Sequence, residues 1–354
     1  MENTTTESLM VVDSLTKAHS IYSKDYKTIL VSVSGGSDSD ILVDICHRMD
    51  PESKRTKYVW VNTGLEYRAT IEHLEYLEKR YGIQIIRQRA KTPIPVSVRK
   101  YGQPFLSKTV SEFMYRLQLH NFQWEDEPYE ELIKKYPRCK SALEWWCNEK
   151  GENSKLNISN NRYLKEFIMA NPPTFAISNK CCEKTKKESI AQVIKSTHAD
   201  LDITGVRKYE GGARGNLKGC FSPKSKKSKC DTYMPLFWYK NEDKEAYARW
   251  YGIANSKCYT DYGLKRTGCC GCPCARNFEE ELATCEKFEP NLAKACNYIF
   301  KDSYAYGRAY RDFVQEQKRK ENSHASTDTA GNHRVEKEVS AGNTDSAHCD
   351  ETRD

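Results

Sequence analysis

The chain has 354 residues, enough for one large or two modest domains. Its 30% charged residues, 38% hydrophobic residues and mean hydropathy of −0.79 are typical of a globular protein in water. No apolar run reaches the roughly 18 residues of a membrane span, and the first residues lack the basic and then apolar pattern of a leader. We therefore expect a cytoplasmic protein without a membrane partner.

The formal charge of +7 is unevenly distributed along the chain. Residues 321–354 carry eight acidic and three basic side chains, so this segment contributes −5 and the remainder contributes +12. A basic excess suits nucleotide phosphates, sulfate or a nucleic-acid backbone, and a solvated basic surface explains it equally well. The tail from residue 322 has almost no large apolar side chain, and we expect it to be disordered.

Strand and helix patterns alternate in the first part of the chain. After a leading amphipathic helix, each of the first two buried-strand patterns is followed by a helical pattern of ten or more residues, which indicates parallel β-α-β units. The predicted helices cover residues 7–22, 39–49 and 67–81, and the predicted strands cover residues 27–34, 57–62 and 83–86.

The middle of the chain, residues 91–179, reads as a helical insertion that is broken by two consecutive prolines. Its helical pieces cover residues 108–120, 130–136 and 160–169. A further strand at 201–206, a Lys/Gly/Ser-rich loop at 208–229 and helical segments at 242–251 and 278–320 follow. We predict four regions: a leading helix (1–26), an α/β domain that contains the insertion (27–275), C-terminal helices (276–321) and the tail (322–354).

A loop of small residues separates the first predicted strand from its helix. Its sequence, SGGSDS, places backbone amides at a helix N-terminus, where unpaired N–H groups and the helix dipole favour an anion. Glycines let the backbone approach a ligand closely, and the hydroxyl groups add donors for a pyrophosphate-sized group. A plain glycine-rich turn with an N-cap is the alternative. The six positions are Ser34, Gly35, Gly36, Ser37, Asp38 and Ser39.

Four later segments follow this loop in a recognisable order. They are VNTGLE (61–66), ITGVRKYEGGAR (203–214), YMPLFWYKNEDKEAYARWYGI (233–253) and YGLKRTGCCGCP (262–273). Together with SGGSDS they resemble the phosphoadenosine phosphosulfate (PAPS) reductase family of the ATP-pyrophosphatase superfamily, over residues 27–313. The resemblance implies a doubly wound, mostly parallel Rossmann-like α/β sheet. It also implies an adenine nucleotide, ATP by preference, bound with Mg²⁺.

Several residues outside the loop become candidates for the same site. An arginine just past a strand at the carboxyl edge of a parallel sheet is suited to grip a sulfate or phosphate, and an ordinary surface salt bridge is the alternative. We predict Arg207, Lys265 and Asp38 as catalytic, with Arg214 and Arg266 as weaker candidates. The predicted nucleotide-binding positions are the six loop residues together with Asn62, Thr63, Gly64, Gly205 and Arg207.

The fifteen cysteines need an explanation that does not depend on secretion. Cys181 and Cys182 are adjacent, and Cys269 and Cys272 form a C-x-x-C pair, so four thiolates can surround one metal centre. In the family, CC…CxxC resembles the pattern that holds a [4Fe–4S] centre. We therefore predict these four as ligands of an iron–sulfur cluster, with zinc as the second choice and a redox-active dithiol as the alternative. Other cysteines that can substitute are Cys220, Cys258, Cys270 and Cys274, while Cys46 and Cys296 read as core.

Two departures from the family pattern bear on the reaction. Sulfonucleotide reductases carry a nucleophilic cysteine in a C-terminal E-C-G-L-H motif, which is absent here, and Cys349 lies in the predicted disordered tail. Reductases also usually have a degenerate first loop, whereas SGGSDS is intact. Both departures favour ATP cleavage between the α- and β-phosphates, followed by sulfur transfer from a donor to an acceptor such as a nucleic acid. The alternatives are a reductase of adenylylsulfate or PAPS that uses a thioredoxin-like reductant, and a nucleic-acid-binding module with a vestigial loop.

Overall fold

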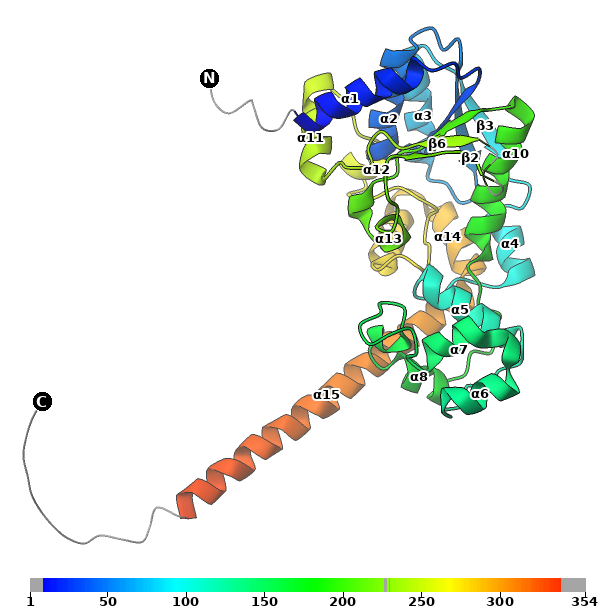
Figure 1. Cartoon of the computed structure of the whole chain (residues 1–354). Helices are drawn as coiled ribbons and strands as arrows, with labels where there is room; N and C mark the ends of the chain where they lie inside the picture. The colour runs from blue at the N-terminus through cyan, green and yellow to red at the C-terminus, as the bar shows by residue number, and fades with distance from the viewer. Residues whose placement is uncertain (1–8, 226–227, 229, 339–354) are drawn as a thin grey trace, which may run out of the picture.

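Six strands form one sheet at the centre of the α/β part of the molecule (Figure 1). The computed structural model describes residues 9–225, 228 and 230–338. The strands lie in the order β3-β2-β1-β4-β6-β5, and every pair is parallel except β5 with β6. Their bounds are β1 Ile29–Ser32, β2 Thr56–Asn62, β3 Ile85–Arg89, β4 Leu201–Ile203, β5 Phe221–Ser222 and β6 Asp231–Tyr233. The predicted doubly wound, mostly parallel α/β fold is confirmed.

The two faces of the sheet are covered by different helices. Successive residues of a strand point to opposite faces; Ile29 and Val31 of β1 pack into the main core, whereas Leu30 packs with Val193 on the other side. The main core is completed by α1 (Leu9–Tyr22), α2 (Ser37–Met49), α3 (Arg68–Tyr81) and α11 (Asn241–Tyr251). The opposite face is covered by α10 (Glu188–Thr197). Both faces are therefore buried, which explains why β1 reads as a continuous apolar run.

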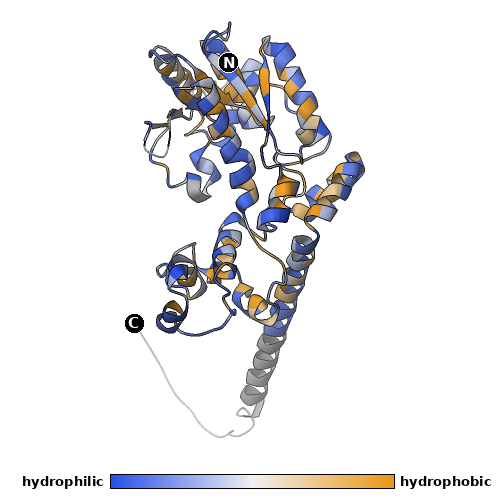
Figure 2. Cartoon of the chain, turned by 90° about the vertical axis from the view of Figure 1, so that its right-hand side faces the viewer, coloured by the Kyte–Doolittle hydropathy of each residue, from blue (hydrophilic) through white to orange (hydrophobic). Residues whose placement is uncertain are grey.

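The helical insertion forms a second unit with its own aromatic core. Its helices are α5 (Lys108–Gln118), α6 (Tyr129–Lys135), α7 (Lys140–Trp146) and α8 (Leu164–Ala170), whereas α4 (Ile94–Tyr101), at the start of the predicted insertion, packs into the core around the thiols. Short 3₁₀ turns cover Pro137–Cys139 and Ile158–Asn160. After it, the chain returns to the sheet through α9 (Lys180–Cys182), a π-helical turn (Glu183–Lys187) and α10. Figure 2 shows the insertion as a mass of its own beside the long C-terminal helix.

Trp145 anchors the core of this insertion. Its side chain is 1% exposed and its ring stacks on Phe113 with the ring centroids 5.4 Å apart. We expect Trp145→Ala to lower the free energy of unfolding by about 3–5 kcal/mol, because it removes a large buried ring and leaves a cavity. The matched control is Trp250→Ala, whose side chain is 42% exposed and whose loss should change stability by less than about 0.5 kcal/mol. Urea denaturation of both variants provides the measurement.

The C-terminal part of the described chain is helical and packs beside the sheet unit. It contains α12 (Lys257–Thr260), α13 (Phe278–Phe288), α14 (Pro290–Ile299) and α15 (Lys301–Glu338). We expected disorder from residue 322, but α15 continues to Glu338 and projects away from the body (Figure 1). Extending an existing helix carries no nucleation cost, so a polar sequence can continue it. Residues 339–354, with Cys349, lie outside the described residues.

Most predicted elements lie within a few residues of the observed ones, but the helical segment predicted at 278–320 is divided into α13, α14 and α15, and α4, α7 and α10 were not predicted. The segment 208–229, interpreted as a loop, contains two 3₁₀ turns (Lys208–Glu210 and Gly212–Arg214) and β5. Strands of two or three residues are created by pairing at a sheet edge and have no periodicity of their own. In the part of the chain that the structure describes, no helix is both long and apolar enough to cross a bilayer. The boundaries predicted for the four regions stay a prediction.

Asp202 gives the sheet a pH-dependent stability. Burial raises the pKa of this β4 carboxyl to about 6, compared with about 3.9 in an unfolded chain. A raised folded-state pKa contributes stability below the unfolded value, and this contribution is lost as the pH rises through the folded value. Asp202→Asn should therefore raise the Tm at about pH 8 and lose this advantage below about pH 4. Thermal scans across this range, with the exposed Glu152→Gln as a control without such a trend, check it.

Candidate nucleotide and thiol site

The SGGSDS loop lies at the carboxyl end of β1 and opens α2, as predicted. Gly35 has φ = +70°, and a Cβ there would lie 2.9 Å from Thr70 Cγ2. Gly36 has an ordinary extended backbone, with φ = −103°, and a Cβ there would lie 2.6 Å from the side-chain oxygen Thr267 Oγ1. Ser39 Oγ accepts a hydrogen bond from the Gly36 N–H at 3.1 Å and donates to the Gly36 carbonyl at 2.8 Å. The loop thus requires glycine at position 35, and a side chain at position 36 would displace the Thr267 hydroxyl.

Two cations flank the acidic residue of the loop. Lys244 Nζ lies 2.6 Å from Asp38 Oδ1 and donates to Ser37 Oγ at 2.9 Å. Arg207 Nε lies 3.1 Å from the same Asp38 oxygen. Lys244 reaches this position because α11 runs beside α2, and Tyr247, one turn further along α11, donates to Asp44 Oδ2 at 2.6 Å. Positive charge therefore gathers where the loop would meet an anion.

Arg207 is where the sequence placed it, past the end of β4, but its side chain is already engaged. It is 6% exposed, and besides Asp38 it donates to Asn241 Oδ1 at 3.1 Å. Gly205, on the same connection, lies against the loop, because a Cβ there would be 3.5 Å from the Asp38 carbonyl. Arg207 therefore positions the loop as much as it supplies charge to it.

The end of β2 forms a second turn at the same edge. The Asn62 side chain accepts from the Gly64 N–H at 2.9 Å, and Gly64 has φ = +91°. Thr63 is buried and both its N–H and its hydroxyl donate to Glu66. Asn62, Thr63 and Gly64 thus form a strand-ending turn at the carboxyl edge of the sheet, where nucleotides bind in doubly wound folds.

The predicted catalytic Lys265 and the weaker candidates Arg214 and Arg266 are not brought to the loop by any hydrogen bond or ion pair among the described residues. Arg214 is exposed and pairs with Glu210. Lys265 and Arg266 are also exposed, and no hydrogen bond or ion pair among the described residues joins either to the loop. Arg266 instead lies near the thiols, where its charge contributes to lowering the pKa of Cys272.

A segment from the C-terminal part covers the loop. The Ser37 N–H donates to the Tyr259 hydroxyl at 3.2 Å, and the Thr267 hydroxyl lies over Gly36. Tyr259 belongs to α12, and Thr267 follows two residues after Lys265 in the chain. One of the helix N-terminal amides predicted to bind an anion therefore contacts a hydroxyl oxygen of the protein.

The two cysteine-rich segments hold two close pairs of thiols, Cys181 with Cys182 and Cys272 with Cys274, and Cys274 is not one of the four predicted ligands. Cys181 and Cys182 share a hydrogen bond in α9, which, with Lys108 and Lys186 nearby, lowers the pKa of Cys182 to about 5. Cys272 accepts a hydrogen bond from the neighbouring Cys274, which lowers its pKa. The pKa of Cys181 is raised, chiefly by its bond to Cys182 and by burial, and also by the charges of Cys272 and Cys269. The structure thus brings the CC pair and the CxxC segment to one place.

The donor chemistry of these thiols is that of a metal or cluster site. In the described residues, no three His, Cys, Asp or Glu side chains are placed to hold one metal ion. A [4Fe–4S] cluster takes four thiolates, and zinc also takes thiolate ligands. Cationic Lys108, Lys186 and Arg266 are close enough to affect the thiol pKa values and so to balance negative charge. The chemistry of the donor set fits the cluster.

The other cysteines separate from this group. Cys270 points away from its neighbour Cys269, with its sulfur 3.0 Å from that of Cys285. Cys258 is buried beside Thr70, at a sulfur–oxygen distance of 3.5 Å. Cys220 packs against the main core, and Cys46 and Cys296 are fully buried, as expected of core residues.

The loop and the thiols are joined by one short stretch of chain. Thr267 lies over Gly36, and two residues later Cys269 Sγ lies 3.6 Å from Thr63 Oγ1. The next amide, that of Cys270, donates to the carbonyl of Leu65 at 2.9 Å. The SGGSDS loop, the β2 turn and a candidate thiol ligand therefore share one edge of the sheet.

Comparison with known proteins decides the family. The sequence profile of the phosphoadenosine phosphosulfate reductase domain matches residues 28–137 and 98–275, which together cover well over half of the chain. The chain belongs to the phosphoadenosine phosphosulfate reductase family. An uncharacterized protein of Methanocaldococcus jannaschii is 31% identical to this family member over 156 residues, 43% of this chain. The match covers only 30% of that relative's length.

Solved structures with a similar fold have low sequence identity to this PAPS reductase family member. The PAPS reductase of Candida auris, in a phosphate complex, is 12% identical with a TM-score of 0.39, over 74% of this chain and 91% of that one. The U34-tRNA thiolase NcsA of Methanococcus maripaludis, with its [4Fe–4S] cluster, is 13% identical with a TM-score of 0.37, over 86% of this chain and 80% of that one.

Sequence reasoning missed three residues that the structure brings to the loop of this family member. They are Lys244, Tyr259 and Thr267. Only Lys244 could have been found from the sequence. It lies three residues before Tyr247, a buried residue of α11, so it is on nearly the same side of that helix. Tyr259 and Thr267 come from a segment without helical or strand periodicity, so their approach to the loop depends on tertiary packing alone.

Proposed function

We propose that this member of the PAPS reductase family binds ATP with Mg²⁺ on the SGGSDS loop and cleaves it between the α- and β-phosphates to drive sulfur transfer to an acceptor. The observation that carries the proposal is the stretch from Thr267 to Cys269. It contacts the loop at one end and places a thiol against the β2 turn at the other. The loop proposed to bind phosphate and the thiol proposed to bind sulfur therefore lie at one edge of the sheet.

The loop supplies the groups that a triphosphate needs. Helix N-terminal amides and a nest of glycine-rich backbone favour the β- and γ-phosphates. Lys244 adds a positive charge beside Ser37. We expect a phosphate oxygen to replace the Tyr259 hydroxyl on the Ser37 N–H, because both are acceptors for the same donor. Asp38 is the carboxylate at this point that would hold Mg²⁺, which supplies further neutralisation of phosphate charge.

The reaction requires positioning more than covalent catalysis. An acceptor oxygen attacks the α-phosphorus, the bond from that phosphorus to the bridging oxygen of the β-phosphate breaks, and pyrophosphate leaves with the electron pair. Lys244 and Arg207 stabilise the negative charge that moves onto the pyrophosphate. Hydrosulfide from a sulfur donor then attacks the adenylated carbon, and AMP leaves with the former acceptor oxygen. This exchange needs no external oxidant or reductant.

We propose that the thiols form the part of the site that handles the transferred sulfur. Cys181, Cys182, Cys269 and Cys272 would hold a [4Fe–4S] cluster, and the cluster would place inorganic sulfide on the thiol side of the site. Lys186, whose pKa is raised chiefly by the charge of Cys269, keeps a positive charge beside these thiols. Thr63 separates Cys269 from the nucleotide side by a single side chain.

The test uses anaerobically purified protein with ATP and Mg²⁺. We expect ATP binding that depends on Mg²⁺, and slow formation of AMP and pyrophosphate, with water as the acceptor. The same protein, given adenylylsulfate or PAPS with thioredoxin, should release no sulfite. Failure to bind ATP with Mg²⁺ would rule out the proposal, and sulfite release would favour a reductase instead.

A further inference from the structure

A groove lies where the helical insertion meets the sheet unit, away from the SGGSDS loop. It consists of two adjoining cavities of about 430 and 740 Å³, which share the side chains of Tyr101, Tyr115 and Phe175. Tyr101 comes from α4, Tyr115 from α5, and Phe175 from the segment after α8. We call this feature the junction groove. None of its lining residues takes part in the chemistry proposed above.

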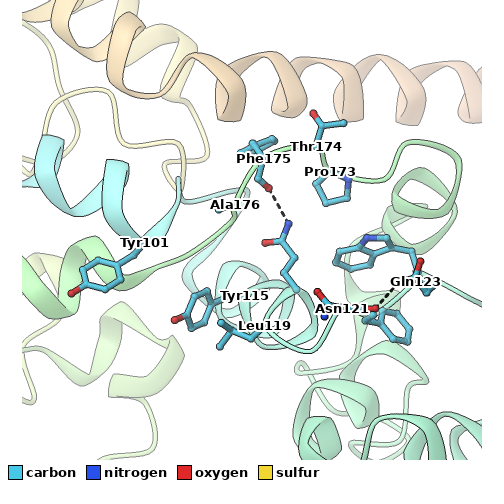
Figure 3. Close-up of a pocket in the computed structure, with 12 residues that line it drawn as sticks. Tyr101, Tyr115, Leu119, Asn121, Gln123, Pro173, Thr174, Phe175 and Ala176 are labelled. Atoms are coloured by element: carbon cyan, nitrogen blue, oxygen red, sulfur yellow. Dashed lines mark hydrogen bonds between the residues drawn. The ribbon is translucent and has the colours of Figure 1, made fainter.

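The groove presents flat rings at one end and amides at the other. Figure 3 shows Tyr101 and Tyr115 along one side of the smaller cavity, with Asn121 and Gln123 at its far end. The larger cavity is bordered by Tyr298, whose side chain is 82% exposed. The Tyr298 ring is thus free to contact a ligand that enters the groove. Aromatic planes of this kind stack on nucleobases of any sequence.

Cations border the same surface. Arg99 and Lys100 line the larger cavity, both are exposed, and neither forms an ion pair with another described residue. Lys180 lies 5.7 Å over the ring of Tyr115 and Lys184 lies 6.0 Å over that of Tyr101, although both also pair with glutamates. Rings flanked by unpaired cations suit a polyanion that carries planar groups, and suit an apolar peptide poorly.

The groove borders the thiols. Lys180 is followed directly by Cys181 and Cys182 in α9, and α9 packs against α4, the helix that carries Arg99 and Lys100. On the other wall, α5 carries Tyr115 and begins at Lys108, whose carbonyl accepts a hydrogen bond at 3.0 Å from the side chain of Asn179, two residues before Cys181. A strand lying in the groove would therefore pass next to the thiol pair. Cavities of a few hundred cubic ångströms enclose a ligand of nucleotide size and are too small for a duplex.

We propose that the junction groove binds single-stranded nucleic acid, with its bases on Tyr101, Tyr115 and Tyr298 and its phosphates on Arg99 and Lys100. The proposal that a single strand binds follows from the groove itself and does not depend on the proposed function. The further step, that this strand is the acceptor of sulfur, rests on the proposed function.

The experiment measures fluorescence anisotropy of a labelled strand of about 16 nucleotides, the upper end of the site size for one such binding domain. The strand is offered to the full chain as RNA, as DNA and as a duplex, without ATP. We expect a single strand to bind more tightly than the duplex. Arg99→Glu with Lys100→Glu should weaken binding and reduce the salt-dependence slope by about 1.4, the value for two lost phosphate contacts. Tyr298→Ala should weaken binding at least about fivefold.

The matched control is the double variant Lys57→Glu with Lys79→Glu, which changes two exposed lysines of the sheet unit. It makes the same change in net charge as the Arg99 and Lys100 variant. The affinity for the single strand, and its decrease in Tyr298→Ala, should remain as in the unmodified chain. Equal weakening by the control pair, an unchanged affinity of Tyr298→Ala, or preference for the duplex would overturn the proposal. Since Tyr298 is exposed, its variant tests the groove even if the charge reversals disturb folding. Because ATP is absent, loss of the proposed ATP reaction would not affect this result.

Discussion

Lys244→Ala should lower the rate of pyrophosphate release from ATP by about 10²- to 10³-fold, the cost of removing one group that stabilises charge in a transition state. The ammonium group lies 2.6 Å from Asp38 and 2.9 Å from the Ser37 hydroxyl, with 17% of the side chain exposed. No other lysine among the described residues contacts the loop through a hydrogen bond or ion pair. Steady-state measurement of AMP and pyrophosphate provides the rate.

Two further variants separate charge from structure. Lys240→Ala removes an exposed lysine just before the same helix, α11, and should leave the rate unchanged. Lys244→Arg keeps the charge and should recover part of the activity. A fall in Tm without a fall in the rate per folded molecule would show that Lys244 only supports the pairing of α11 with α2.

The sheet and its loop are predictable from sequence because local patterns determine them. The apolar run at Ile29–Ser32 must be buried on both faces, and SGGSDS follows it with two glycines at positions where a Cβ would collide with Thr70 or Thr267. Periodicity and small residues are local signals, so both the strand and the loop were located. The predicted disorder from residue 322 stays a prediction: low hydrophobicity favours it, whereas the helix that begins at Lys301 continues to Glu338 and needs no new nucleus to do so.

The composition of the site was predictable only in part. Arg207 and the strand-ending turn at Thr63 follow strands, so the common carboxyl edge of a parallel sheet places them. Lys265 was predicted because it lies in the cysteine-rich segment that resembles the family. The lysine that contacts the loop is Lys244, which the packing of α11 brings there. Cys269 and Cys270 are adjacent in sequence, but the first contacts Thr63 and the second contacts Cys285. The direction of the backbone determines this difference, and it cannot be inferred from the amino-acid composition.

Adjacent cysteines give the sharpest test of the thiol group. Cys269→Ser should remove most of the iron and sulfide from anaerobically purified protein, because a cluster of this kind takes four thiolates and serine is a poor substitute for soft ligands. The double variant Cys181→Ser with Cys182→Ser should lose the metal completely. Iron, sulfide and zinc analysis, with the visible absorbance spectrum, provides the measurement.

Cys270→Ser is the matched control, since it changes the next residue of the same segment. The Cys270 thiol donates a hydrogen bond to Cys285 and contacts none of the candidate ligands through a hydrogen bond. The metal content of the Cys270→Ser variant should therefore equal that of the unmodified chain. Equal loss from Cys269→Ser and Cys270→Ser would point to general disruption of the segment. If the unmodified chain contains zinc and not iron, and the same variants lose it, the proposed ligands would be correct and the metal would be zinc. Absence of both metals from the unmodified chain would leave the group as redox-active thiols, and the sulfur-transfer proposal would lose its sulfur site.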